Sequence, residues 1–138
     1  MHEALKEAYK ALVEKEMPVG AIIVSQGVII ARAHNQVEKL NDPLAHAEIL
    51  AISAATEYIN SKYLSDCIMY VTLEPCIMCA SALKWAKIGG IVYGAKNNKE
   101  GFGNYNIPLL HPKTKLTKGI LEKESITLLD DFFNNIRI

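Results

Sequence analysis

The stretch from Cys67 to Ala95, CIMYVTLEPCIMCASALKWAKIGGIVYGA, decides the fold of this chain. Two apolar runs, Cys67–Leu73 and Gly90–Ala95, flank a segment that follows Pro75 and has helical character from Cys76 to Lys87. Short continuous apolar runs are typical of strands that are covered on both faces. A strand, a helix and a second strand in this order predict a βαβ unit, and therefore an α/β protein.

The rest of the chain supplies further helices and strands around this unit. Apolar residues at helical spacing predict an amphipathic helix over Glu3–Lys15, ended by Met17-Pro18, and a second helix from about Ala45 to Ile59. The other predicted elements are a hairpin of Ala21–Ser25 and Val28–Ala33 joined at Gln26-Gly27, a short strand near Lys115–Lys118, and a closing helix over Glu122–Ile136. The sum is one mixed sheet between helices. At 138 residues we expect a single domain, residues 1–138.

Composition indicates a globular chain without a membrane span. Half of the residues are hydrophobic and 22% are charged, which supplies a packed core and gives no case for disorder. The longest stretch without charge, Met17–Ala31, is interrupted by proline and glycine and is shorter than the roughly 20 apolar residues of a spanning helix. The start, Met1–Glu7, mixes acids and bases and carries no secretory signal. We therefore expect a cytoplasmic protein.

The formal net charge is zero, but the charges are unevenly distributed. The window from Lys84 to Lys118 contains seven lysines and one acid, Glu100, so its net charge is +6 while the remainder carries −6. Aromatic residues are interleaved with these lysines: Trp85, Tyr93, Phe102 and Tyr105. This pattern is typical of a surface that holds phosphates and stacks unpaired bases. An ordinary solvated lysine face is the alternative, because only clustering in space makes a binding patch.

The residues that carry chemistry stand at two predicted helix starts. Cys76 and Cys79 are three residues apart, so a helix directs both sulfurs the same way, and its N-terminus favours their thiolate forms. His46 supplies a third ligand, of nitrogen, from the other helix start. Three ligands of this kind suit zinc and leave an open position for a water, whose pKa zinc lowers towards about 7. Glu48, two residues after His46, fits a proton shuttle for that water.

Two other interpretations of the cysteines are weaker. A thioredoxin-like Cys-x-x-Cys would not require the upstream His-x-Glu. A closed structural site with Cys67 as the fourth ligand is conceivable, but Cys67 begins a buried-looking strand and is more simply a small core residue.

The order His-x-Glu followed by Pro-Cys-x-x-Cys is the signature of zinc deaminases. Beyond it, the chain resembles the bacterial tRNA adenosine deaminases of the cytidine/deoxycytidylate deaminase superfamily nearly end to end. The matching stretches are Met17–Ala21, Asp42–Glu48, Tyr70–Ala80, and the ending Gly119-Ile120-Leu121 with Phe132-Phe133.

This resemblance implies a three-layer α/β/α cytidine-deaminase-like fold, with a mixed five-stranded sheet between helices, in a homodimer. It implies hydrolytic deamination of the wobble adenosine, position 34, of tRNA to inosine, with the anticodon stem-loop as partner. Carried over residue by residue, His46, Cys76 and Cys79 bind one Zn²⁺ per subunit and Glu48 is the general acid/base. Asn35 matches the asparagine that hydrogen-bonds the target base.

The chain departs from the family pattern in two places. In the loop after Tyr93-Gly94-Ala95, Asn97 replaces the usual acidic residue, and Phe102 and Asn104 alter a Gly-Ala-x-Gly-Ser run. The basic tail is reduced to Asn134–Ile138. By the resemblance, this loop contacts the nucleotides flanking the target. With the reduced tail, we expect phosphate binding to rest more on the Lys84–Lys118 stretch.

Two alternative functions follow from the same residues. A zinc-dependent deaminase of a free base or nucleoside, such as guanine or cytosine, shares the signature, but a free base carries no phosphate for the basic window to attract. A noncatalytic RNA-binding module with structural zinc would have no use for the Glu48 carboxylate.

Overall fold

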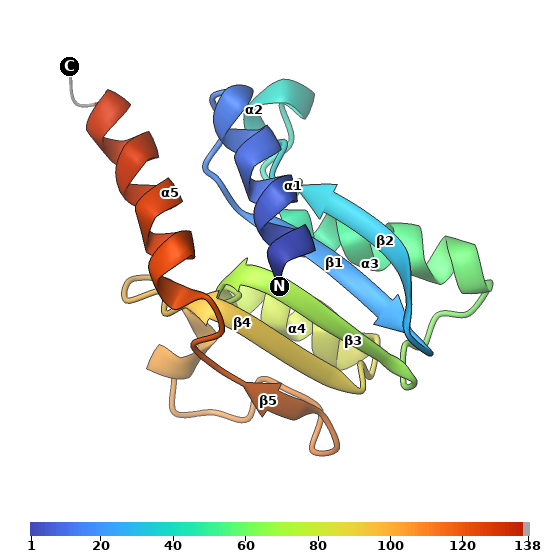
Figure 1. Cartoon of the computed structure of the whole chain (residues 1–138). Helices are drawn as coiled ribbons and strands as arrows, with labels where there is room; N and C mark the ends of the chain where they lie inside the picture. Colours follow the sequence, from blue (N-terminus) through green and yellow to red (C-terminus); the bar gives the residue numbers. More distant parts are fainter. Residues whose placement is uncertain (137–138) are drawn as a thin grey trace.

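The computed structural model, which describes residues 1–136, contains one mixed sheet of five strands in the order β2-β1-β3-β4-β5 (Figure 1). β1 is antiparallel to both of its neighbours, whereas β3, β4 and β5 run parallel. The strands are β1 (Gly20–Ser25), β2 (Val28–His34), β3 (Cys67–Leu73), β4 (Gly90–Ala95) and β5 (Lys115–Thr117). Arg137 and Ile138, in the tail considered above, lie outside the described residues.

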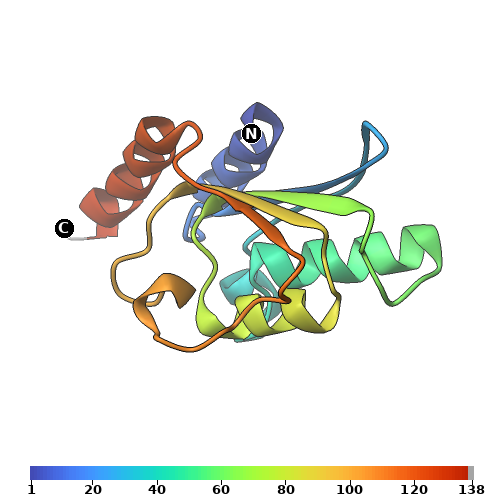
Figure 2. The ribbon, with the colours of Figure 1, turned by 90° about the horizontal axis from the view of Figure 1, so that it is seen from below.

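Helices cover the sheet on both faces (Figure 2). α1 (His2–Val13) and α5 (Glu122–Ile136) lie on one face, and α3 (Ala47–Ile59) and α4 (Ile77–Trp85) lie on the other. This arrangement confirms the predicted three-layer α/β/α fold. Two short elements escaped prediction: α2 (Val37–Leu40), between β2 and α3, and the 3₁₀ turn η1 (Phe102–Asn104), after β4.

Three of the four predicted helices extend beyond the observed ones, for identifiable reasons. Lys15 and Lys87 have φ angles of 63° and 52°, so each stands in the left-handed region just beyond the observed end of its helix. At the other end, His46 and Cys76 are extended, with ψ of 151° and 173°, and precede α3 and α4 as their N-cap residues. The two metal-ligand candidates are therefore held at helix boundaries rather than inside helices.

Strand burial agrees only in part with the prediction of two covered faces. Met69 and Val71 of β3 are fully buried, but Ile68 is 39% exposed. The predicted turn at Gln26-Gly27 is present, with φ angles of 51° and 79°. These paired positive angles are those of a type I′ hairpin turn. Among residues 1–136, no helix has both the length and the apolar character to cross a bilayer.

The first helix approaches the sheet through small residues. Ala4, Ala8 and Ala11 are completely buried. Gly20, the first residue of β1, lies directly beneath them, and a Cβ atom there would overlap the Ala4 carbonyl oxygen and the Ala8 backbone nitrogen. The contact between α1 and β1 thus depends on the missing side chain of Gly20.

We expect Gly20→Ala to destabilise the protein by about 3 kcal/mol, because the added methyl group meets backbone atoms that cannot rotate away. Urea unfolding of zinc-loaded protein measures the change. Gly27→Ala is the matched control, since nothing lies within 4 Å of its Cβ position and only its φ of +79° opposes the substitution. That control is expected to lose about 1 kcal/mol; equal losses in both variants would contradict the packing argument.

Candidate active site

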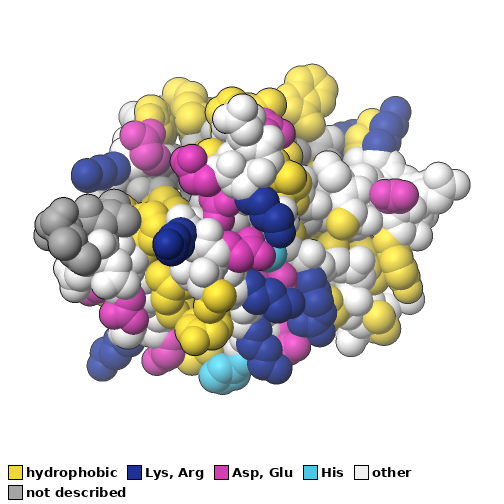
Figure 3. Space-filling view, turned by 90° about the horizontal axis from the view of Figure 1, so that it is seen from above, with side chains coloured by type: hydrophobic (Ala, Val, Ile, Leu, Met, Phe, Trp, Pro, Cys, Tyr) yellow, Lys and Arg dark blue, Asp and Glu magenta, His cyan; other side chains and the backbone are white. Residues whose placement is uncertain are grey.

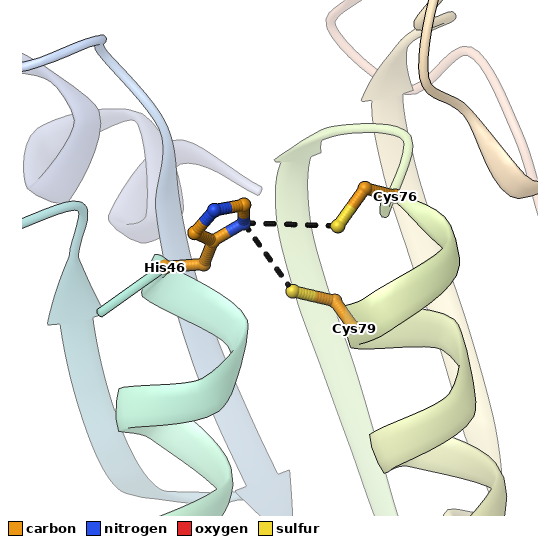
Figure 4. A group of neighbouring side chains, drawn as sticks. All are labelled: His46, Cys76 and Cys79. Atoms are coloured by element: carbon orange, nitrogen blue, oxygen red, sulfur yellow. Dashed lines mark hydrogen bonds between the residues drawn. The ribbon is translucent and has the colours of Figure 1, made fainter. Parts of the chain in front are cut away.

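Three ligating atoms meet where α3 and α4 begin (Figure 4). His46 and Cys76 precede the two helices, and Cys79 lies in the first turn of α4. The His46 Nδ1 atom is 3.7 Å from Cys76 Sγ and 3.6 Å from Cys79 Sγ. All three ligating atoms lie within 4.8 Å of one another.

These distances fit a tetrahedral zinc ion. With Zn–N near 2.05 Å and Zn–S near 2.3 Å, tetrahedral angles place a nitrogen and a sulfur ligand about 3.6 Å apart. Within residues 1–136, no other group of three metal-binding side chains is present. Cys67 is not part of this group and packs in the hydrophobic core. Within residues 1–136, His46, Cys76 and Cys79 would therefore hold one Zn²⁺.

The two sulfurs differ sharply in their affinity for a proton. A hydrogen bond from the Cys79 thiol, supported by His46, lowers the pKa of Cys76 to about 4. The same hydrogen bond, together with burial, raises the pKa of Cys79. The hydrogen bond with Cys76 also raises the pKa of His46. The site thus favours the thiolate form of Cys76, and a thiolate is the form of sulfur that binds a divalent cation.

Glu48 stands in the first turn of α3 beside this group. Its side chain is only 4% exposed. Burial raises its pKa to about 7, a shift that its own backbone N–H and the Cys79 thiol only partly offset. A carboxyl group with a pKa near neutrality can accept and return a proton at physiological pH.

Asn35 lies across the pocket, directly after β2. Its Nδ2 donates to the Met17 carbonyl oxygen at 3.3 Å, and its Oδ1 accepts from the Val37 N–H at 3.3 Å. Each atom retains capacity for one more hydrogen bond.

Four of the five predicted site residues line one pocket of about 490 Å³, a size typical of small-molecule sites. They are Asn35, His46, Glu48 and Cys76. Cys79 is fully buried next to them. The structure adds Glu74, Lys99 and Glu100 to the lining, which were not predicted. Glu74 could have been recognised from the sequence, because it is a charged residue between a buried strand and Pro75.

The lysine-rich window does not form one basic groove. Lys99 lines the pocket, and Lys96 lines two adjoining cavities. Lys115 pairs with Gly90 at the start of β4, so it lies at the end of the sheet opposite the site. On the face shown in Figure 3, Lys and Arg side chains are interspersed with Asp and Glu. Both interpretations of the window are thus partly right: Lys96, Lys99 and Lys118 line the pocket or a cavity beside it, whereas Lys115 lies at the far end of the sheet.

Comparison with known proteins agrees with this geometry. Residues 1–95 match the family described as cytidine and deoxycytidylate deaminase zinc-binding region. The tRNA-specific adenosine deaminase of Aquifex aeolicus (strain VF5) is 47% identical over 97% of this chain and 91% of its own length. A solved structure from work on A-to-I editing by tRNA:A34 deaminases at the wobble position of transfer RNA has a TM-score of 0.88 and 40% identity, over 94% of this chain and 97% of that chain. The guanine deaminase of Bacillus subtilis is 40% identical with a TM-score of 0.67, over 69% of this chain and 61% of its own.

The fold and the site define the class, a zinc-dependent hydrolytic deaminase. The chain belongs to the cytidine and deoxycytidylate deaminase zinc-binding family, and within it to the group of the tRNA-specific adenosine deaminases. The likeness to that group extends over nearly the whole chain, whereas the likeness to the guanine deaminase covers about two thirds of it.

The raised pKa of Glu48 predicts a pH-dependent stability of the metal-free protein. Because burial raises this pKa from 4.5 to about 7, the folded state binds more protons than the unfolded state in that interval. Stability is therefore lost as the pH rises through this window. Glu48→Gln removes the penalty, so we expect its Tm advantage over wild type to be larger at about pH 8 than at about pH 5.

Calorimetry of both metal-free proteins at the two pH values measures this difference. Glu57→Gln, an exposed position on the same helix, is the control and is expected to change little. A Glu48→Gln advantage of equal size at both pH values would contradict the assignment.

Proposed function

We propose that this protein hydrolyses the wobble adenosine of a tRNA anticodon stem-loop to inosine and ammonia. The observation that carries the proposal is the convergence of three zinc ligands and a buried carboxyl group on one pocket that can admit a base. The near full-length similarity to tRNA-specific adenosine deaminases supports tRNA as the substrate.

Each site residue has a separate task in this reaction. His46, Cys76 and Cys79 would hold the zinc ion, which supplies Lewis acidity that makes water nucleophilic at neutral pH. Glu48 accepts a proton from the water that attacks C6 of adenine. It delivers this proton to the ring nitrogen, then takes the second proton from the oxygen now bonded to C6 and passes it to the amino group, which leaves as ammonia. The pKa of Glu48, raised to about 7, suits both directions of transfer.

Asn35 would bind the target base. One N–H and one oxygen lone pair of its amide remain after its contacts to Met17 and Val37, and both are available to the edge of a purine. Because these local hydrogen bonds already fix the amide, the base meets a group that needs no reorganisation.

An anticodon loop suits this pocket. Its bases are unpaired, so extruding one into a pocket requires little energy. Lys96 and Lys99 would hold the phosphates next to the target.

We further propose that residues 1–138 constitute one deaminase domain, since β5 and α5 complete the same sheet and layers that the family-matched region begins. A tRNA-modifying role points to the cytoplasm as its location.

The decisive assay incubates zinc-loaded protein with an anticodon stem-loop carrying adenosine at the wobble position, and in parallel with free guanine, cytosine and adenine. We expect inosine in the stem-loop and no ammonia from the free bases. Ammonia from a free base alone would replace this function by that of a base deaminase.

In the same assay, Glu48→Ala should retain its zinc and lose about 10²–10⁴-fold in rate, because proton transfer is removed. Glu57→Ala is the control. A Glu48→Ala rate close to that of wild type would remove Glu48 from the mechanism.

A homodimer is the second part of this proposal. Trp85 at the end of α4 is 83% exposed, and Ile77 and Met78 on the same helix are half-buried. An exposed tryptophan is unusual in a monomer and is enriched at protein interfaces. A second copy of this chain would remove it from water.

We expect Trp85→Glu to shift the protein from dimer to monomer in sedimentation analysis, because a charge would be buried at the interface. Tyr9→Glu is the matched control, since Tyr9 is 59% exposed on α1, in the opposite helical layer. A Trp85→Glu protein that remains dimeric would rule out α4 as the contact.

A further inference from the structure

The loop between β4 and β5 forms one wall of the substrate pocket. Asn97, Lys99 and Glu100 of this loop line the pocket, yet the loop carries only the short turn η1 as regular structure. A wall of this kind keeps its shape only if something outside the loop holds it.

Glu74, the residue after β3, binds the first part of this loop, residues 97–103, at both ends. Its side chain is 2% exposed. Its Oε1 accepts a hydrogen bond from the Asn97 N–H at 3.1 Å, and its Oε2 accepts one from the Gly103 N–H at 2.8 Å. No ion pair to Glu74 is formed by any residue of the described part of the chain. The buried carboxylate is therefore satisfied by loop amides alone.

The backbone around Glu74 continues the attachment. The Glu74 N–H donates to the Ala95 carbonyl oxygen at 2.8 Å, and the Phe102 N–H donates to the Pro75 carbonyl oxygen at 2.9 Å. Cys76 forms an isolated antiparallel bridge with Gly101. The three-residue segment 74–76 thus binds the loop through hydrogen bonds and also supplies the metal ligand Cys76.

Two glycines allow this close approach. A Cβ atom on Gly101 would lie 2.5 Å from Glu74 Oε1, and one on Gly103 would lie 2.6 Å from Glu74 Oε2. For Gly103, among residues 1–136 and apart from its chain neighbours, only Glu74 has atoms within 4 Å of that position. Glycine is needed at both positions because the Glu74 carboxyl group occupies the space that a Cβ atom would take.

We propose that Glu74 is a positioning residue that fixes the 97–103 loop against the metal-ligand segment and thereby sets the binding of the RNA substrate. Each of its oxygens accepts a hydrogen bond from the backbone of this loop, and through that backbone it positions Asn97, Lys99 and Glu100 in the pocket wall. The inference rests on the proposed function of the pocket.

The test is Glu74→Gln in the zinc-loaded protein. The amide keeps the shape of the side chain but turns an N–H towards one of the loop N–H groups, so one hydrogen bond is replaced by an opposed pair of donors. We expect KM for the stem-loop to rise about tenfold or more, with kcat within about threefold and zinc content unchanged. Amide hydrogen exchange should accelerate at Asn97 and Gly103.

Glu16→Gln is a matched control. Glu16 is 1% exposed and accepts two backbone hydrogen bonds, from the Glu38 N–H at 3.0 Å and the Lys39 N–H at 2.7 Å. Glu38 and Lys39 lie in α2, outside the pocket lining. Amide exchange at Asn97 and Gly103 should stay as in wild type, because Glu16 holds α2 and not the 97–103 loop. Equal acceleration of exchange at these two positions in both variants would show a general effect of losing a buried carboxylate and would overturn the proposal.

Gly103→Ala tests the same contact from the loop side and leaves Glu74 intact. It should raise KM as Glu74→Gln does, and the double variant E74Q/G103A should be no worse than the stronger single variant. Additive effects would overturn the proposal. If wild-type protein leaves the stem-loop unchanged, the proposed function fails, while unaltered exchange at Asn97 and Gly103 in Glu74→Gln would by itself disprove the positioning role.

Discussion

Convergence of one imidazole and two thiol groups within 4.8 Å is the constraint on which the rest of the structure depends. The ligands come from the starts of two helices, so α3 and α4 must begin side by side at the same end of the sheet (Figure 4). Small residues make this possible: Ala47, Ala51 and Ala55 are completely buried along one side of α3. Larger side chains there would push the helix from the sheet and separate the ligands.

The strand order meets the same constraint on the other side of the pocket. β1 lies between β2 and β3, so the chain that leaves β2 at Asn35 stands opposite the chain that leaves β3 at Glu74. Because β3 and β4 are parallel, the loop that follows Ala95 also emerges at this edge. The segment that follows β2, the metal-ligand segment and the loop after β4 therefore meet at one end of the sheet, as in other α/β proteins whose sites lie at strand ends.

Local features of this protein could be predicted from its sequence, and long-range ones could not. The βαβ unit, the hairpin turn and the closing helix follow from apolar runs and glycine positions, and Cys67–Leu73, Gly90–Ala95 and Glu122–Ile136 have the predicted bounds. The ligand set was predictable because Cys76 and Cys79 share a helix turn. The spread of the lysines was not, since parallel pairing of β5 with β4 carries Lys115 to the far end of the sheet. Nor was the role of Glu74, whose partners are 23 and 29 residues away.

The pocket contains two buried carboxyl groups, Glu48 and Glu74, and their different surroundings give them different roles. Glu48 faces the ligands from a helix start, where burial raises its pKa to about 7 and it can exchange a proton. Glu74 is buried as deeply, but each of its oxygens accepts a hydrogen bond from a loop N–H, so its side chain is engaged in holding the loop. Both residues are glutamates, so residue type does not distinguish their roles. Their hydrogen-bond partners decide whether a buried carboxyl group transfers protons or organises the backbone.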